Sequence, residues 1–397
     1  MDMRDKVVQI GLDVHRKFSA VSVRDEAGRI LTRQRLDHVD RQKLRKTIAS
    51  WPVGTPVMLE ATFGWGWLSD ELLTLKMDPH LASSRKVAAW REGRGLAKSN
   101  TIDADLLSEL WSEKPTIKHG RMRRWWEVWL APREVRDQRE LLRHRMTLVR
   151  TQTRIKNAIH AMMHRHGILI EQSDLFGVAG RRMLQQLTTE EDGTLRETAR
   201  RTLKDDLMLL DCLRRLIARL TRQFRATVRR SDMGRRLITL PGVSTILAYT
   251  IAAEIGRIDR FPVSRCLLRY SLLGPCADDS GEERSGKPIG RRLGHAGRKT
   301  LQWAWIEAAH GAVRKDKGLR ENFNRRTDNG RKDRGRGYIK VANRMCRIAY
   351  SMMKKGADYQ EDSPPRPGSR RSQEASSRPG TGQLSRDIGH KPEAIEA

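Results

Sequence analysis

The chain has 397 residues, and its 78 Lys and Arg against 48 Asp and Glu give a formal net charge of +30. This charge favours a polyanionic partner, most often nucleic acid, while a hydrophobic fraction of 38% excludes disorder throughout the chain. Because the sequence has no long uncharged apolar run, no secretory signal pattern and no CxxC among its four cysteines, we expect a cytoplasmic protein without membrane contact, disulfides or zinc.

Residues 1–115 predict an α/β domain. Apolar and alternating runs at 7–13, 18–24 and 30–36 predict three strands, and their short links favour an antiparallel meander. The elements expected next are a helix at 39–50, a central strand at 56–60, a helix at 67–75, a short strand at 80–83 and a helix at 102–111.

Residues 130–230 predict a helical arm. After Pro132 no Gly or Pro occurs up to residue 166, and apolar residues recur every seven positions, as they do again over 195–228. The repeats are Leu141, Leu148, Ile155, Met162 and Leu169, then Leu203, Leu210, Ile217 and Phe224. A seven-residue repeat is typical of a coiled coil, so the two helices either pack on each other or form a dimerisation seam.

Residues 235–356 predict a basic, helical third domain, and 362–397 a disordered tail rich in Ser, Pro, Gly and Arg. Residues 238–256 indicate a helix, a Pro-Gly turn and a second helix. Such a helix-hairpin-helix offers backbone N–H groups to a phosphate, although a plain turn between two helices has the same pattern.

Three acidic residues are candidate metal ligands. Asp13 ends the first strand, Glu60 ends the fourth, and Asp103 lies near the start of a later helix. Carboxylates at these positions can converge on one point, and carboxylate oxygens bind Mg²⁺. Two such ions can stabilise the attacking and leaving oxygens of a phosphodiester. The order predicts an RNase H-like metal site.

The loop at 274–286 contains two Ser-Gly pairs, at Ser280 and Ser285, and a basic segment follows it. The basic segment suggests phosphate contacts. A serine in such a loop is ordinarily a turn residue, but it becomes a nucleophile when a base or a metal activates it.

Three stretches together resemble the insertion sequence one-ten (DEDD) family of transposases, in the right order over about residues 7–356. They are IGLDVHRKFSAVSV; VMLEATFGWGW followed by KSNTIDADLL; and LITLPGVSTILAYTIAAEIGRIDRF followed by LLGPCADDSGEERSG, LGHAGRKTLQWAWIEAA and YIKVANRMCRIAYSMMKKG. The resemblance implies a RuvC-like, RNase H-type domain joined by a coiled coil to a C-terminal transposase domain.

The resemblance also implies roles for residues. Asp13, Glu60 and Asp103 match acidic positions that bind Mg²⁺, and Ser280 matches a serine that attacks DNA and forms a phosphoserine link. Family members assemble as multimers around a structured bridge RNA that pairs with donor and target DNA, so DNA, a guide RNA and further copies of the chain are the expected partners.

The sequence departs from the family pattern at two points. Asn100 stands where a further acidic residue is usual; its carbonyl oxygen can bind Mg²⁺ but adds no charge, and Asp105 is the alternative. The loop after Ser280 is longer than usual, so Ser285 is a rival nucleophile. We therefore expect an RNA-guided DNA transposase or recombinase; the alternatives are a metal-dependent junction nuclease and an inert DNA- or RNA-binding relic.

Overall fold

The computed structural model describes residues 9–118, 120–190, 193–276, 292–293 and 298–361. Ser280, Ser285 and the tail expected at 362–397 lie outside the described residues. Within the described ranges, no helix is long and apolar enough to cross a lipid bilayer. The thiols of Cys212, Cys266 and Cys346 are free.

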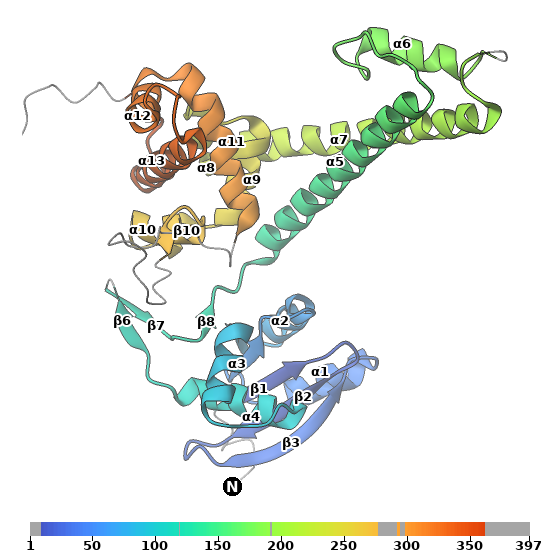
Figure 1. Cartoon of the computed structure of the whole chain (residues 1–397). Helices are drawn as coiled ribbons and strands as arrows, with labels where there is room; N and C mark the ends of the chain where they lie inside the picture. Colours follow the sequence, from blue (N-terminus) through green and yellow to red (C-terminus); the bar gives the residue numbers. More distant parts are fainter. Residues whose placement is uncertain (1–8, 119, 191–192, 277–291, 294–297, 362–397) are drawn as a thin grey trace, which may run out of the picture. The chain divides into compact units, whose positions relative to one another are not determined.

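A mixed sheet of six strands forms the N-terminal part of the fold (Figure 1). Its strands are β1 (Gln9–Val14), β2 (Phe18–Arg24), β3 (Ile30–Asp37), β4 (Pro56–Glu60), β5 (Asp78–Ala82) and β8 (Glu127–Val128), in the order β3-β2-β1-β4-β5-β8. The first three form the predicted antiparallel meander. β4 runs parallel to β1, and β5 runs parallel to β4, so the carboxyl ends of these three strands share one edge.

Successive side chains along each strand point to opposite faces of this sheet, and each face packs against its own pair of helices. Four helices pack on the sheet: α1 (Arg41–Ala49), α2 (Trp65–Thr74), α3 (Ser84–Gly93) and α4 (Asn100–Glu109). Ile10 and Leu12 belong to a hydrophobic cluster that includes buried residues of α1 and α2. Met58 belongs to a second cluster that includes residues of α3 and α4. α1 and α2 therefore cover one face, and α3 and α4 cover the other.

Short elements follow α4 that the sequence did not predict. They are a 3₁₀ turn (Leu110–Ser112) and a hairpin of β6 (Thr116–Lys118) and β7 (Arg121–Arg123), before edge strand β8. The described residues of the hairpin strands are exposed, so no alternation of buried and exposed side chains marks them in the sequence.

Two long helices, α5 (Arg133–Arg165) and α7 (Glu197–Arg230), form the arm, with α6 (Val178–Leu187) between them (Figure 1). Their bounds agree with the predicted helices to within two residues. Ile155 and Met162 of the first seam are buried in the same cluster as Leu203 and Leu210 of the second. The seven-residue repeats thus pack partly on each other within one chain, and dimerisation through them stays a prediction.

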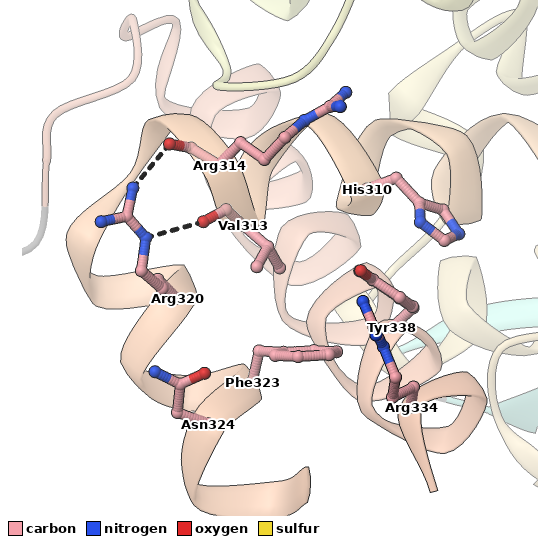
Figure 2. Close-up of a pocket in the computed structure, with 8 residues that line it drawn as sticks. All are labelled: His310, Val313, Arg314, Arg320, Phe323, Asn324, Arg334 and Tyr338. Carbon is pink, nitrogen blue, oxygen red and sulfur yellow. Dashed lines mark hydrogen bonds between the residues drawn. The ribbon is translucent and has the colours of Figure 1, made fainter. Parts of the chain in front are cut away.

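The C-terminal helices share a separate hydrophobic cluster around Trp305. They are α8 (Asp232–Thr239), α9 (Thr245–Ile255), α10 (Ser264–Tyr270), α11 (Lys299–Lys315), α12 (Lys317–Thr327) and α13 (Arg334–Lys355). A two-stranded ribbon, β9 (Pro275–Cys276) with β10 (Arg292–Leu293), lies between α10 and α11 in the chain. Helices α11, α12 and α13 border a pocket, which is drawn in Figure 2.

The arm is joined to the C-terminal helices at its base. Arg139 of α5 is only 5% exposed, and its guanidinium donates hydrogen bonds of 2.9 Å to the carbonyl oxygens of Ala253 and Glu254, at the end of α9. One turn earlier on α9, the ring of Tyr249 stacks on Phe224 of α7 at 3.6 Å. Both arm helices are therefore anchored to α9.

The predicted helix, Pro-Gly turn and helix at 238–256 are present as α8, the turn and α9. Gly242 in the turn has φ +80, and an added Cβ there would lie 2.2 Å from the carbonyl oxygen of Ala308 and 2.3 Å from the amide nitrogen of Ala312. The turn thus packs directly against α11, and this contact requires glycine. Internal packing explains the Pro-Gly turn, while phosphate binding by it stays a prediction.

Candidate active site

Asp13 and Glu60 lie at the same edge of the sheet. The parallel register pairs Leu12 with Leu59, so Asp13 and Glu60 follow directly on neighbouring strands. Asp13 and Gly11 are two residues apart on β1, so both point to the face of the sheet that α4 covers, and not to the face covered by α1 and α2. Its exposed fraction is 7%, which is low for a carboxylate.

Helix α4 supplies the third carboxylate. It begins at Asn100 because the Ser99 hydroxyl accepts a hydrogen bond from the amide of Ile102, and Asp103 in the first turn is 9% exposed. The helix lies directly on β1: a Cβ added to Gly11 would lie 2.3 Å from the Ala104 carbonyl oxygen and 2.3 Å from the Ser108 amide nitrogen. This contact brings Asp103 to the strand that carries Asp13.

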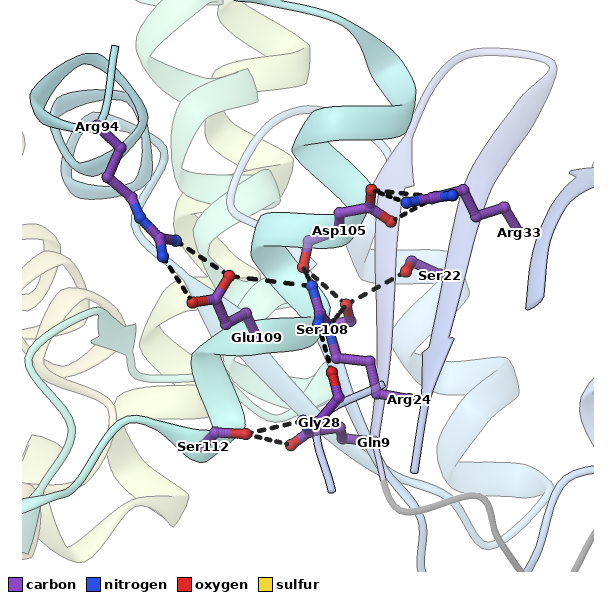
Figure 3. A network of polar contacts seen from close by, with 10 residues as sticks. All are labelled: Gln9, Ser22, Arg24, Gly28, Arg33, Arg94, Asp105, Ser108, Glu109 and Ser112. Carbon is purple, nitrogen blue, oxygen red and sulfur yellow. Dashed lines mark hydrogen bonds and ion pairs between the residues drawn. The ribbon is translucent and has the colours of Figure 1, made fainter. Parts of the chain in front are cut away.

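A network of polar side chains fixes α4 on the sheet (Figure 3). Arg24 of β2 donates hydrogen bonds to the Ser108 hydroxyl at 2.8 Å and to the Asp105 carbonyl oxygen at 3.1 Å. Gln9 of β1 reaches Ser112 beyond the helix, at 2.8 Å. These bonds hold the helix at both its middle and its end.

Asp105 is part of this network and not of the carboxylate group. Its side chain accepts hydrogen bonds of 3.0–3.1 Å from the guanidinium of Arg33 on β3 (Figure 3). Two residues along a helix from Asp103, its side chain leaves the helix in a different direction. The Arg33 contact argues against Asp105 as a ligand, while a ligand role for Asn100 stays a prediction.

The three carboxylates act on one another electrostatically. Burial raises the pKa of Asp13, and the negative charge of Asp103 raises it further, although the neighbouring His15 opposes the rise. Burial also raises the pKa of Glu60, and the charges of Asp13 and Asp103 add to that rise, while Ser84 opposes it. Mutual repulsion of this kind identifies a group of like charges in one place.

Two basic side chains compensate part of this charge. Arg91 of α3 donates a 2.8 Å hydrogen bond to a carboxylate oxygen of Asp103, and His15 Nε2 lies 3.0 Å from a carboxylate oxygen of Asp13. Lys98, just before α4, lowers the pKa of both Asp13 and Glu60. The Arg91–Asp103 pair was not predicted, since pairing between α3 and α4 depends on tertiary structure.

The donor chemistry of this group suits Mg²⁺, which prefers carboxylate and carbonyl oxygens. In the ranges that the structure describes, however, no three His, Cys, Asp or Glu side chains already surround one point as metal ligands do. Arg91 contacts one carboxylate oxygen of Asp103, and His15 lies beside one carboxylate oxygen of Asp13. An ion would bind these side chains through their second oxygens.

A pocket of about 500 Å³ adjoins the start of α4. Asn100 lines it, together with Phe63, which is 64% exposed. Arg35 of β3 also lines it, and its guanidinium stacks on the Phe18 ring at 3.7 Å. The remaining lining residues are His15, Arg16 and Lys17. Basic and aromatic groups beside the carboxylates are those that contact phosphates and bases.

The second group predicted from the sequence cannot be placed. Ser280 and its rival Ser285 lie outside the described residues, so the structure brings neither of them to the carboxylates. The described residues nearest to them in the chain are the strands of the β9–β10 ribbon.

Part of the chain is similar to a known class of proteins, the transposases. Residues 234–324, which run from α8 into α12, match the family model described as "Transposase IS116/IS110/IS902 family". The matched region includes positions 280 and 285, whereas Asp13, Glu60 and Asp103 precede it.

One particular relative extends this similarity along the chain. The chain is 24% identical over 309 residues to a protein of Pseudomonas aeruginosa described as "Probable family 20 transposase". The alignment covers 77% of this chain and 84% of the relative. The chain is thus similar to transposases of this type both in its C-terminal helices and over most of its length.

Proposed function

We propose that this protein is a DNA transposase or recombinase of a bacterial insertion sequence. The observation that carries the proposal is the position of Asp13 and Glu60 at one edge of the sheet, with Asp103 of α4 packed against β1, beside a basic pocket. The similarity of residues 234–324 to a transposase family supports the same function. The net charge of +30 suits a polyanionic substrate.

We infer that the sheet domain is RNase H-like, of the RuvC type. Its strand order and its antiparallel first three strands support this assignment. Asp13, Glu60 and Asp103, with the side-chain oxygen of Asn100, would hold Mg²⁺. A bound ion of this kind stabilises the charge that develops on the oxygens of a phosphodiester during displacement. Lys98 and the basic pocket would hold the strand that carries that phosphodiester.

Ser280 is the proposed nucleophile. Its Oγ forms a bond to the DNA phosphorus, a deoxyribose oxygen leaves with the electron pair of the broken bond, and the hydroxyl proton is lost to a base. The phosphoserine keeps the energy of the phosphodiester, so rejoining needs no ATP. By resemblance to the family, a structured bridge RNA selects donor and target DNA, and several copies of the chain assemble on it.

Paired variants test this proposal. Asp13→Ala should abolish strand transfer with Mg²⁺ while the protein still binds DNA, because a side chain at the edge of the sheet adds little to the core. Glu26→Ala, in the exposed turn between β2 and β3, removes the same charge away from the carboxylates and should leave the activity unchanged. Full activity of Asp13→Ala would contradict the assignment.

Ser280→Ala should bind DNA but form no covalent protein–DNA adduct on a denaturing gel, whereas Ser285→Ala should retain the adduct. The reverse result would move the nucleophile to Ser285. Cleavage with Mg²⁺ by the unaltered protein without any adduct would favour the junction nuclease, and no cleavage at all would favour an inert binding protein.

Asn100→Asp tests the fourth ligand. If Asn100 contacts the ion, the added negative charge should tighten Mg²⁺ binding, measured by calorimetric titration of the protein without nucleic acid. An unchanged titration would show that other residues complete the site.

A further inference from the structure

A second pocket, of about 540 Å³, lies between α11, α12 and α13, which carry none of the three carboxylates (Figure 2). This volume is within the usual range of small-ligand sites. None of the side chains that line it is acidic. Its lining combines aromatic rings on one wall with guanidinium groups at the rim, and nothing in the proposed chemistry uses it.

The aromatic wall is built around Tyr338 of α13. The imidazole of His310 on α11 lies 3.7 Å from the Tyr338 ring centroid, and the ring of Phe323 on α12 lies 4.6 Å from it on a tilted plane. Gly337 permits this packing, because a Cβ there would lie 2.3 Å from the Thr327 side chain and 2.8 Å from the Phe323 ring. Phe323 is buried, whereas the side chain of His310 is exposed.

The rim of the pocket carries three positively charged guanidinium groups. The guanidinium of Arg320 already donates hydrogen bonds within the protein, to the carbonyl oxygens of Val313 at 3.0 Å and Arg314 at 2.6 Å (Figure 2). Arg314 and Arg334 are exposed and line the pocket, and among the described residues no ion pair to an acidic side chain is recorded for either. Asn324 adds an amide at the same rim.

We propose that this pocket binds one unpaired nucleotide of a nucleic-acid strand. The base stacks on the exposed imidazole of the His310–Tyr338 pair, and the guanidinium groups of Arg314 and Arg334 contact the adjoining phosphates. A base inside a duplex has no free face for such stacking, so the pocket selects a single-stranded, looped or extruded nucleotide over paired DNA. The inference rests on the proposed function only in that it takes the substrate to be nucleic acid.

Binding to the full-length protein tests this inference. The probe is a short fluorescent single-stranded DNA that carries one aminopurine, compared with the same strand in a duplex and with its RNA counterpart. His310→Ala removes an exposed ring without opening the core, and it should weaken single-strand binding by about tenfold and reduce stacking-dependent quenching of the aminopurine. Duplex binding should change little.

Charge at the rim is tested by a matched pair of double variants. Arg314→Gln with Arg334→Gln should weaken single-strand binding by at least about tenfold and lower its salt slope by about 1.4, the value for two lost phosphate contacts. Lys315→Gln with Lys317→Gln removes two charges from exposed neighbours that do not line the pocket, and should have a much smaller effect. Thermal melting of each variant checks that the fold is kept.

The outcomes separate the two proposals. Equal losses in the pocket and control variants, or unchanged quenching in His310→Ala, would overturn the pocket as a nucleotide site while leaving the transposase proposal intact. Competition by a free mononucleotide as strong as by the oligonucleotide would overturn the assignment to a strand. Failure of the unaltered protein to bind any DNA or RNA would overturn the proposed function as well.

Discussion

The ionised forms of Asp13 and Glu60 destabilise the folded protein. A carboxylate whose pKa is raised by burial and by like charges favours the protonated form, so the folded protein binds a proton more readily than the unfolded chain does. These two groups therefore destabilise the folded protein least at low pH, and the destabilisation grows as the pH rises from the unfolded pKa through the raised folded pKa. Such a cost is typical of side chains kept for chemistry.

Asp13→Asn should accordingly stabilise the protein without metal. In EDTA at neutral pH we expect a higher melting temperature and a free energy of unfolding larger by about 1 kcal/mol, because the variant removes the buried charge and its repulsion by the other carboxylates. The gain should vanish on acidification below the unfolded pKa. Added Mg²⁺ should stabilise the unaltered protein and have less effect on the variant, as measured by calorimetry. A variant less stable than the unaltered protein at neutral pH in EDTA would contradict this account.

At the scale of elements, the position of α4 decides whether the carboxylates meet. Small residues let the helix lie on the sheet: Gly11 has no side chain, and the hydroxyls of Ser22 and Ser108 form a buried hydrogen bond of 3.3 Å between strand and helix. The same contact sets the distance from Asp103 to Asp13. Packing and chemistry are thus coupled through one glycine.

Gly11→Ala should displace α4 while leaving every charged residue in place. Because the added Cβ would meet backbone atoms of α4, the helix has to shift, and overpacking of this kind costs about 1–3 kcal/mol. We expect a lower melting temperature together with a loss of strand transfer larger than the loss of folded protein. Unchanged melting would show that α4 adjusts without strain.

The short edge strand β8 is held to β5 by an ion-paired histidine. His80 lies 2.9 Å from carboxylate oxygens of both Glu127 and Asp78. Burial alone would lower the pKa of His80, but the hydrogen bonds to Glu127 and Asp78 raise it above its ordinary value. Protonated His80 therefore stabilises the fold below the unfolded pKa, and this contribution is lost as the pH rises through the raised folded pKa.

His80→Gln should destabilise the protein by about 1 kcal/mol below pH ~6, since the carboxylates are partly exposed and the pairs are weakened by solvent. The difference from the unaltered protein should shrink towards alkaline pH. Denaturant melts over a pH series measure it, and a difference that stays constant with pH would exclude the charged histidine as its cause.

At the scale of the whole molecule, the net charge of +30 makes nucleic-acid affinity depend on salt. If the complex has about 6–10 phosphate contacts, the association constant should fall by roughly 10³–10⁵ between about 50 and 200 mM salt. Fluorescence anisotropy across this range measures the slope. A nearly flat dependence would mean that the basic surface serves solubility rather than binding.

The sequence predicted those elements whose pattern is local. The alternation in β1–β3 and the seven-residue repeats of α5 and α7 depend only on nearby residues, and the structure confirms these elements. Helix α3 was missed because only Val87 of its residues is buried, which leaves no apolar periodicity. The Arg91–Asp103 pair and the pocket at His310 join separate elements, so only the three-dimensional packing brings them together.

Arg139 has a mechanical consequence. A buried guanidinium that loses its partners costs about 3–5 kcal/mol, so α5 cannot pivot on α9 without that loss. Since Phe224 ties α7 to the same helix, the arm resembles a lever whose short end is clamped. A partner that binds near α6 and moves the arm would therefore also move α9 and the Gly242 turn, because α5 and α7 are both anchored to α9.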